Sequence, residues 1–183
     1  MNIIIPMAGI GSRLRPHTLT VPKPLVPLAG KAIVQRLVED IAKVVNEPLE
    51  EIAFVIGPNE QFFGKEVQKN LLEVAAKLGA KGSINIQEEA LGTAHAIYMA
   101  KQALTGNVIV AFADTLFRAD FVLDATVDGT VWVKEVEDPR AFGVVQLDAY
   151  GIIEDFVEKP ENPQSNLAII GIYYFKNGES LRT

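Results

Sequence analysis

Residues 2–25 read NIIIPMAGIGSRLRPHTLTVPKPL, an apolar run that passes into a glycine-containing loop and then a proline-rich segment. The run from Asn2 to Pro6 is short and rich in isoleucine, which is typical of a strand buried on both faces of a parallel sheet. The loop that follows is therefore expected at the carboxyl end of a strand, where open α/β sheets bind their ligands. This stretch predicts an α/β fold with a binding site at one edge of its sheet.

The loop combines a bendable backbone with fixed cations. Gly9 and Gly11 permit positive φ and let consecutive N–H groups converge on phosphate oxygens. Arg13 adds a forked, permanently charged donor. Prolines at 16, 22, 24 and 27 exclude a regular helix over residues 16–27 and hold Lys23 in a restricted geometry. These features predict a preorganised site for the phosphates of a nucleotide.

Two familiar phosphate motifs fit the sequence poorly. The dinucleotide fingerprint G-x-G-x-x-G requires a third glycine where this chain has Leu14, and Pro16 follows soon after. A Walker loop requires a hydroxyl residue after Gly-Lys, but neither Gly-Lys pair, at residues 30–31 and 64–65, is followed by one. The sequence therefore disfavours a nicotinamide dehydrogenase and a P-loop NTPase.

The whole pattern strongly resembles the signature of sugar-1-phosphate nucleotidylyltransferases. The matching features are G-x-G-S-R-L at residues 9–14 and the ten-residue spacing from Arg13 to Lys23 within a proline-rich loop. Residues 5–9, IPMAG, also resemble the bacterial glucose-1-phosphate uridylyl- and thymidylyltransferases. The resemblance implies a nucleoside triphosphate and a sugar 1-phosphate as substrates, with Arg13 and Lys23 stabilising negative charge during catalysis. The loop residues that it assigns to the nucleotide are Ala8, Gly9, Gly11, Ser12, Arg13 and Lys23.

Composition limits the classes of protein to consider. The chain has 183 residues, 49% hydrophobic and 22% charged, which is enough for one well-buried domain without a disordered bias. A net charge of −6 argues against a nucleic-acid or anionic-membrane surface. The absence of cysteine excludes disulfides and thiolate chemistry. The N-terminal apolar run is too short for a signal peptide or a membrane span, so a cytoplasmic location is expected. A homo-oligomer stays an open alternative.

Apolar periodicity alternates between strands and helices along the chain. Helical spacing within residues 33–44 and 63–78 predicts two amphipathic helices. Strands are expected at residues 2–6, 52–56, 83–87, 107–113, 130–136, 143–147, 152–158 and 168–175, with a hairpin turn at 148–151. This order predicts an α/β, Rossmann-like three-layer sandwich with a mixed, mainly parallel central sheet, forming a single domain over residues 1–183.

A base-binding segment is expected at residues 87–95, QEEALGTAH, which begin at a strand end and enter a helix at Gly92 and Thr93. In the family, this Gln-plus-Gly pattern contacts a pyrimidine. Gln87 offers both a donor and an acceptor to the edge of uracil or thymine, and Gly92 leaves room for the ring. His95 and His17 lack metal-ligand spacing and are interpreted as structural or peripheral.

Asp114 is the predicted ligand of Mg²⁺ and the third predicted catalytic residue. It follows the most apolar central strand, and magnesium usually takes one or two carboxylates besides phosphate oxygens and water. The alternative is that Asp114 caps the start of a helix. In the family, the equivalent aspartate is often preceded by glycine, where this chain has Ala113.

The motifs AFGVV at residues 141–145 and VEKP at 157–160 open and close the predicted hairpin. In the family, they form the sugar-phosphate side of the site. The glycine would lend a backbone N–H to a sugar oxygen, the glutamate would accept from vicinal hydroxyls, and the lysine would neutralise the phosphate. Trp132, Tyr173 and Tyr174 fall in strand patterns and are expected to pack in the core or in the hairpin. The expected sugar-side residues are Gly143, Glu158, Lys159, Asn166 and Gly171.

The resemblance also leaves alternatives open. In the family, a second metal-binding aspartate follows the strand matched by residues 168–175, but no aspartate follows Asp155 in this sequence. We therefore expect a catalytic domain that is incomplete at its C-terminus. The competing hypothesis is a regulatory domain of the same fold that binds a nucleotide or sugar nucleotide without turnover. The sequence does not distinguish uracil from thymine, and glucose is favoured only by the resemblance.

Overall fold

The computed structural model describes residues 1–9, 11, 15–16, 18–118 and 122–182. The strands are β1 (Asn2–Pro6), β2 (Pro27–Leu28), β3 (Lys31–Ala32), β4 (Glu51–Ile56), β5 (Lys81–Ile86), β6 (Val108–Ala111), β7 (Gly129–Glu135), β8 (Gly143–Leu147), β9 (Ile153–Glu158) and β10 (Leu167–Phe175). The α-helices are α1 (Ile33–Val44), α2 (Glu60–Phe63), α3 (Lys65–Lys77) and α4 (Thr93–Met99). The 3-10 turns are η2 (Lys23–Leu25), η3 (Pro139–Ala141) and η4 (Gly178–Arg182).

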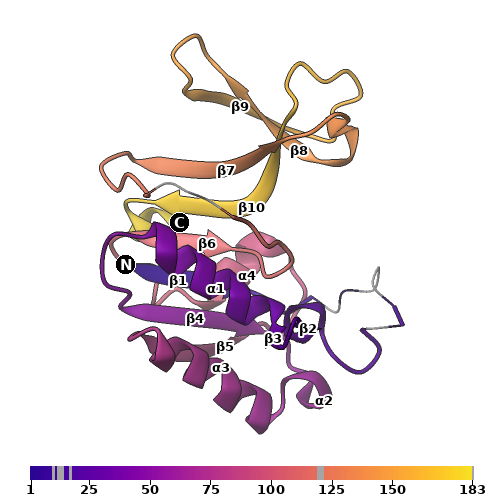
Figure 1. Ribbon diagram of the computed structural model, residues 1–183, viewed down its shortest axis with the longest axis vertical. Helices are drawn as coiled ribbons and strands as arrows, with labels where there is room; N and C mark the ends of the chain where they lie inside the picture. The colour runs from indigo at the N-terminus through magenta and orange to yellow at the C-terminus, as the bar shows by residue number, and fades with distance from the viewer. Residues whose placement is uncertain (10, 12–14, 17, 119–121, 183) are drawn as a thin grey trace.

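One mixed sheet organises the molecule (Figure 1). Within the described residues it has eight strands in the order β5-β4-β1-β6-β10-β8-β9, and β7 also pairs with β10. Strands β5, β4, β1 and β6 are parallel, whereas β10 runs antiparallel to β6, β7 and β8. A short ribbon of β2 and β3 stands apart from this sheet. The predicted α/β class with a mixed central sheet is confirmed.

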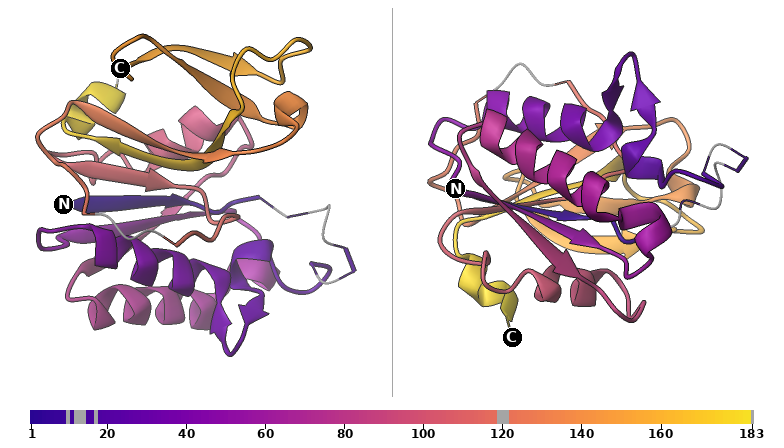
Figure 2. Two further views of the ribbon diagram at one scale, coloured as in Figure 1. Left: turned by 45° about the horizontal axis from the view of Figure 1, so that its top comes forward. Right: turned by 90° about the horizontal axis from the view of Figure 1, so that it is seen from below.

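Helices cover both faces of the parallel strands. Figure 2 shows α1 and α3 on one face and α4 on the other. The alternation of side chains along β1 explains this layering, because successive residues of a strand point to opposite faces. Ile3 and Ile5 pack in the cluster that contains the apolar residues of α1 and α3, whereas Ile4 packs with Ala96 of α4. All three isoleucines are fully buried, and each contributes about 1.5–3 kcal/mol of hydrophobic stabilisation.

The predicted second helix is divided in two. Asn59 caps α2, because its Oδ1 accepts a hydrogen bond from the backbone N–H of Gln61 at 2.9 Å. Gly64 then has an extended backbone, with φ −62° and ψ 173°, and serves as the N-cap of α3. The helical spacing of apolar residues in the sequence continues across this break, because Phe63 is buried on the same side of the sheet as Leu71.

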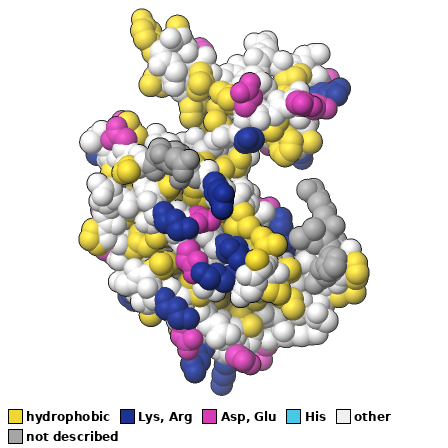
Figure 3. All heavy atoms as spheres, in the orientation of Figure 1, with side chains coloured by type: hydrophobic (Ala, Val, Ile, Leu, Met, Phe, Trp, Pro, Cys, Tyr) yellow, Lys and Arg dark blue, Asp and Glu magenta, His cyan; other side chains and the backbone are white. Residues whose placement is uncertain are grey.

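Charged side chains of both signs are interspersed on the face seen in Figure 3. Among the ion pairs of the chain, Lys31 Nζ lies 2.7 Å from Glu39 Oε2, and this lysine holds the pKa of Glu39 below its usual value. Exposed pairs of this kind contribute little to stability. None of the described helices is long and apolar enough to cross a membrane.

Candidate functional site

A cleft of about 1000 Å³ lies where β1, β5 and β6 end. Because these strands are parallel, their carboxyl ends meet at one edge of the sheet, and the segments that leave them line the cleft. The hairpin of β8 and β9, at the top of Figure 1, supplies the opposite side. The predicted site residues that line the cleft are Ala8, Gly9, Lys23, Gln87, Gly92, Asp114, Gly143, Glu158 and Gly171.

Lys23 and Asp114 meet in this cleft. Lys23 begins η2, in the proline-rich segment, and its Nζ lies 3.5 Å from Asp114 Oδ2. The side chain of Asp114 is 60% exposed, and no helix begins in the described residues 115–118 that follow it. The helix-cap alternative therefore has no support, and the carboxylate is open to a ligand in the cleft.

Gly11 is packed against Lys23, although it does not line the cleft among the described residues. Its φ is +65°, and a Cβ at this position would lie 2.8 Å from Lys23 Cβ. The hydroxyl of buried Thr18 donates to the carbonyl of Gly11 at 2.8 Å. Only glycine fits here without strain, and the loop thereby supports the stem of Lys23. The predicted phosphate contacts of Ser12 and Arg13 lie outside the described residues and stay predictions.

Gln87 lies at the carboxyl end of β5 with only 8% of its surface exposed. Its backbone N–H donates to the carbonyl of Ile56 at 2.9 Å. Its side-chain nitrogen lies 3.1 Å from both the carbonyl oxygen of Gly92 and Nδ1 of His95. The side-chain N–H groups of Gln87, which were expected to bind a base, therefore form hydrogen bonds within the protein. The side-chain carbonyl oxygen of Gln87 is left to bind a ligand.

Gly92 has φ +99°, a backbone conformation that favours glycine, and a Cβ there would meet no heavy atom within 4 Å among the described residues. Its carbonyl also accepts the backbone N–H of Ala96 at 3.2 Å, the first turn of α4. The predicted helix start is confirmed, and the space beside Gly92 is open toward the cleft.

Gly143 and Glu158 face each other at the open end of the hairpin, as partners in the β8–β9 pairing. A Cβ at Gly143 would lie 2.9 Å from Glu158 Oε2, so the absence of a side chain at Gly143 makes room for this carboxylate. The backbone N–H of Lys159 donates to the carbonyl of Phe142 at 3.0 Å and closes the pair. The structure thus brings together two of the predicted sugar-side residues.

Two predicted sugar-side residues do not line the cleft. The Nζ of Lys159 lies 3.3 Å from Glu158 Oε1 on an exposed part of the hairpin. The side chain of Asn166 is also exposed and donates to Glu135 Oε1 at 2.9 Å. Their roles stay predictions, and a sugar phosphate would need to reach out of the cleft to meet them.

Gly171 lies in β10, beside the irregularity in its pairing with β7. Its φ is +80°, and a Cβ would be 3.4 Å from the ring of Phe112. The Gly171 carbonyl accepts the backbone N–H of Phe112 at 2.9 Å. The backbone at Gly171 therefore lies beside the end of β6, close to Asp114, and lines the cleft as the predicted backbone contact with a sugar requires.

Among the cleft residues that the sequence analysis did not place there are Lys134 and Tyr173, of which Tyr173 was expected in core or hairpin packing. Tyr173 packs edge-on against Phe112, with ring centroids 6.3 Å apart. Burial and the charge of Glu158 raise its pKa. Tyr174, its neighbour, is buried in the core as expected. The two-residue alternation along β10 puts the neighbouring tyrosines on opposite faces, which was the signal available in the sequence.

Asp114 is the described cleft residue best suited to a metal ion. Within the described residues, no group of three or more His, Cys, Asp and Glu side chains is arranged to hold a metal. Mg²⁺ binds through one or two carboxylates when phosphate oxygens and water complete its coordination. An exposed carboxylate in a cleft lined by a lysine and backbone amides fits such a hydrated ion, held together with its phosphate ligand.

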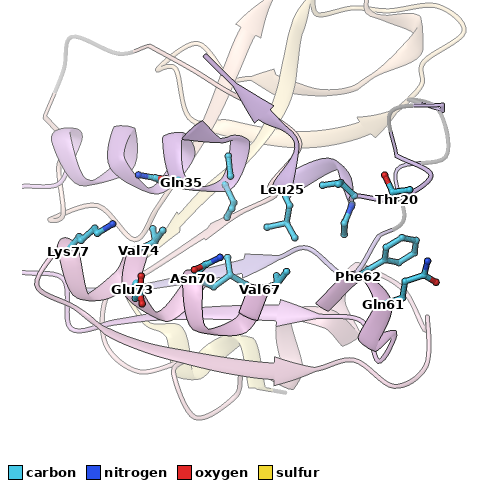
Figure 4. Close-up of a pocket in the computed structure, with 15 residues that line it drawn as sticks. Thr20, Leu25, Gln35, Gln61, Phe62, Val67, Asn70, Glu73, Val74 and Lys77 are labelled. Carbon is cyan, nitrogen blue, oxygen red and sulfur yellow. The ribbon is translucent and has the colours of Figure 1, made fainter. Parts of the chain in front are cut away.

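A second hollow, of about 500 Å³, lies between α1 and α3 (Figure 4). Side chains from α3, among them Val67 and Val74, face Leu25 from the segment that precedes α1. None of the predicted site residues that the structure describes lines this hollow. The candidate site is therefore the cleft at the strand ends.

Comparison with known proteins shows the family to which this fold belongs. A protein-family model described as nucleotidyl transferase matches residues 2–182. The bifunctional protein GlmU of Methanococcus aeolicus is 32% identical over 179 residues, 97% of this chain and 40% of that protein. The mannose-1-phosphate guanylyltransferase catalytic subunit beta of Xenopus tropicalis is 34% identical over 188 residues, 96% of this chain and 49% of that protein. The chain therefore spans less than half the length of these curated relatives.

Among solved structures, UDP-glucose pyrophosphorylase in complex with UDP-glucose is similar, with a TM-score of 0.73 and 27% identity. The similarity covers 96% of this chain and 75% of that one. The shared fold therefore includes both the parallel strands and the antiparallel hairpin that enclose the cleft.

Proposed function

This chain belongs to the nucleotidyl transferase family, and we propose that it joins a nucleoside triphosphate to a sugar 1-phosphate, releasing pyrophosphate. UTP or dTTP is the favoured nucleotide and glucose 1-phosphate the favoured sugar. One observation carries the proposal: a single cleft holds the Lys23–Asp114 pair between Gln87 on one side and Gly143 with Glu158 on the other.

The reaction is an in-line displacement at phosphorus. A phosphate oxygen of the sugar 1-phosphate attacks the α-phosphorus of the triphosphate and forms a new P–O bond. The bond from the α-phosphorus to the oxygen that bridges to the β-phosphorus breaks, and pyrophosphate leaves with the electron pair. No covalent intermediate with the enzyme is needed, so the protein contributes positioning and charge stabilisation.

Lys23 supplies positive charge where the phosphates would lie. Its ammonium is held in the cleft by η2 and by the contact with Asp114, and it can turn from that carboxylate to a phosphate oxygen. Arg13 is proposed to add a second, bidentate cation from the loop after β1. Asp114 would hold Mg²⁺, which would supply positive charge to neutralise the phosphates of the nucleotide.

The hairpin side of the cleft would bind the sugar. The Glu158 carboxylate, beside the bare backbone of Gly143, can accept hydrogen bonds from two vicinal hydroxyls. Lys134 and Lys159 provide cations on this side, one inside the cleft and one on its outer rim. The choice of glucose is supported by the sequence resemblance and by the UDP-glucose complex of the similar structure.

Titration calorimetry of the 183-residue chain with UTP, dTTP, GTP, CTP, ATP and NAD in Mg²⁺ tests the nucleotide part of the proposal. We expect UTP or dTTP to bind preferentially, and Lys23→Ala, Arg13→Ala and Gln87→Ala each to weaken that binding. A Thr126→Ala variant, outside the cleft, serves as the control. Absence of triphosphate binding would contradict the proposal.

An assay of pyrophosphate release with glucose 1-phosphate tests the transfer step. Release that depends on both substrates supports a transferase. Nucleotide binding without any release would favour the regulatory alternative, a domain that binds the nucleotide without turnover.

A further inference from the structure

The side-chain amide of Gln87 has no donor left for a ligand. An amide nitrogen carries two hydrogens, and two acceptors, the Gly92 carbonyl and His95 Nδ1, each lie 3.1 Å from it. The carbonyl of Gly92 can only accept, so the nitrogen end of the amide must face it. It follows that His95 Nδ1 also accepts and that the neutral imidazole carries its proton on Nε2.

The oxygen end of the same amide is available. Gln87 lines the cleft, and no described residue donates a hydrogen bond to its Oε1. Turning the amide over would place its oxygen against the Gly92 carbonyl, and the contact with His95 would survive only if the ring proton moved to Nδ1. The bond to His95 therefore occupies the second amide hydrogen, which Gly92 alone would leave free to meet a base.

We propose that His95 is a positioning residue that fixes the Gln87 amide so that only Oε1 meets the nucleobase, and that this oxygen selects a pyrimidine carrying N3–H. The inference rests on the proposed nucleotide-binding function. Uracil and thymine have a hydrogen on N3, whereas the N3 of cytosine is an unprotonated acceptor whose lone pair would face Oε1. A buried site built for one hydrogen-bond pattern rejects a ligand that leaves its group unpaired.

The local fold explains why a histidine at this position can do this. His95 lies in the first turn of α4, three residues after Gly92, whose carbonyl also accepts the Ala96 N–H that starts the helix. The contact from Gln87 thus ties the end of β5 to the start of α4. The backbone of Gln87 is itself held by Ile56, so the side chain has little freedom to seek another orientation.

The first test needs no nucleotide. The ring-nitrogen NMR signals of His95, separated from those of the only other histidine by a His17→Gln variant, report its tautomer. We expect the Nε2–H tautomer in the neutral side chain. The Nδ1–H tautomer would overturn the inference, even if the protein binds triphosphates as proposed.

The second test compares His95→Leu with His95→Asn. Leucine removes the acceptor, whereas the Oδ1 of asparagine lies close to the position of histidine Nδ1 and can replace it. The ratio of UTP to CTP affinity should fall by about three- to tenfold in His95→Leu, the worth of one hydrogen bond, and should be largely restored in His95→Asn. Inorganic tripolyphosphate, which has no base, should bind all three proteins equally.

Several outcomes would overturn the proposal. One is an unchanged ratio of UTP affinity to CTP affinity in a folded His95→Leu protein. Another is a loss of tripolyphosphate affinity in His95→Leu as large as its loss of UTP affinity. If His95→Leu does not fold, the ring-nitrogen signals still test the role of His95, and wild-type protein tests the base contact with N3-methyl-UTP. In this analogue a methyl group replaces the N3 hydrogen, and it should bind at least about tenfold more weakly than UTP. Absence of binding by every triphosphate would instead overturn the proposed function, and the base selection with it.

Discussion

The ammonium of Lys23 lies 3.5 Å from a carboxylate oxygen of Asp114, and the two residues come from distant parts of the chain. The pair joins the proline-rich segment after β1 to the turn after β6. Both side chains are open to solvent, 27% and 60% exposed, so the contact itself contributes at most about 1 kcal/mol. Its importance is that it places a cation and the carboxylate that we propose as a ligand of Mg²⁺ at one point of the cleft.

Replacing Asp114 by Asn should remove the Mg²⁺ dependence of triphosphate binding. Without the carboxylate, added Mg²⁺ has no protein ligand at this point and should no longer raise affinity. In the absence of Mg²⁺, the variant should bind the triphosphate at least as tightly as the wild type, because a repelling charge has gone and Lys23 is free to bind phosphate. Titration with and without Mg²⁺ checks both expectations, with Asp128→Asn, outside the cleft, as the control. Mg²⁺ dependence that persists in Asp114→Asn would refute the assignment.

Gly11→Ala should lower both stability and triphosphate affinity. The new Cβ would lie 2.8 Å from Lys23 Cβ at a residue with φ +65°. Gly79→Ala is the matched control, because its φ is +76° and its Cβ would meet no described atom within 4 Å. The backbone strain alone costs about 1–3 kcal/mol in either variant. Urea denaturation should show the larger loss for Gly11→Ala, and only this variant should bind triphosphate more weakly.

Gly143→Ala should weaken sugar 1-phosphate binding selectively. Its Cβ would lie 2.9 Å from Glu158 Oε2, and the carboxylate would have to move from the position that faces the cleft. The fold should survive, because the obstructing atom is the end of a flexible side chain. Titrations with glucose 1-phosphate and with UTP separate the two effects. A variant that loses UTP affinity to the same extent would contradict the assignment of Gly143 to the sugar side.

The carboxyl group of Asp138 should titrate unusually low. Hydrogen bonds from the Arg140 side chain, at 2.8 Å, and from its backbone N–H, at 3.2 Å, hold the pKa of Asp138 at about 2 instead of 3.8. Because the folded-state pKa is depressed, this contact stabilises η3 fully above pH 3.8 and loses its effect as the pH falls through about 2. NMR titration of the carboxyl carbon checks the midpoint, which should rise toward 3.8 in Arg140→Gln. An identical midpoint in the two proteins would rule out the arginine as its cause.

Asn2→Ala should destabilise the protein without changing ligand binding. The buried amide of Asn2 donates to the carbonyls of Ala103 and Thr105 at 2.9 and 3.2 Å. Its removal leaves these carbonyls without that donor, at a cost of about 1–3 kcal/mol in the free energy of unfolding. Urea denaturation measures the loss, and Asn70→Ala, at an exposed helix position, is the control. Equal stabilities of the two variants would show that the Asn2 contacts do not matter.

The sequence predicted the secondary structure well where one physical pattern was sufficient. The isoleucines of β1 and the apolar spacing of α1 were visible locally, because burial on two faces or on one stripe imposes a period on the residues themselves. The split between α2 and α3 was missed, since apolar residues continue in phase across Gly64 and only its extended backbone ends the helix.

Prediction of the site was limited by side chains whose partners come from elsewhere. The donor of Gln87 was expected to be free, but it is bound to Gly92 and His95. Lys159 and Asn166 were expected beside the sugar, but neither lines the cleft, and their side chains contact Glu158 and Glu135. These contacts produce no periodic pattern in the sequence, because hydrogen-bond partners depend on proximity in three dimensions.

By itself, the sequence determined the family, the α/β order of elements, and the glycine and proline constraints that fix the loop around Lys23. These are properties of short segments, in which backbone sterics and hydrophobic periodicity act between near neighbours. Only the tertiary structure decided that Lys23 meets Asp114, that Gly143 makes room for Glu158, and that Gln87 faces the cleft as an acceptor. Those relationships depend on parallel strands ending at one edge, which folding alone brings together.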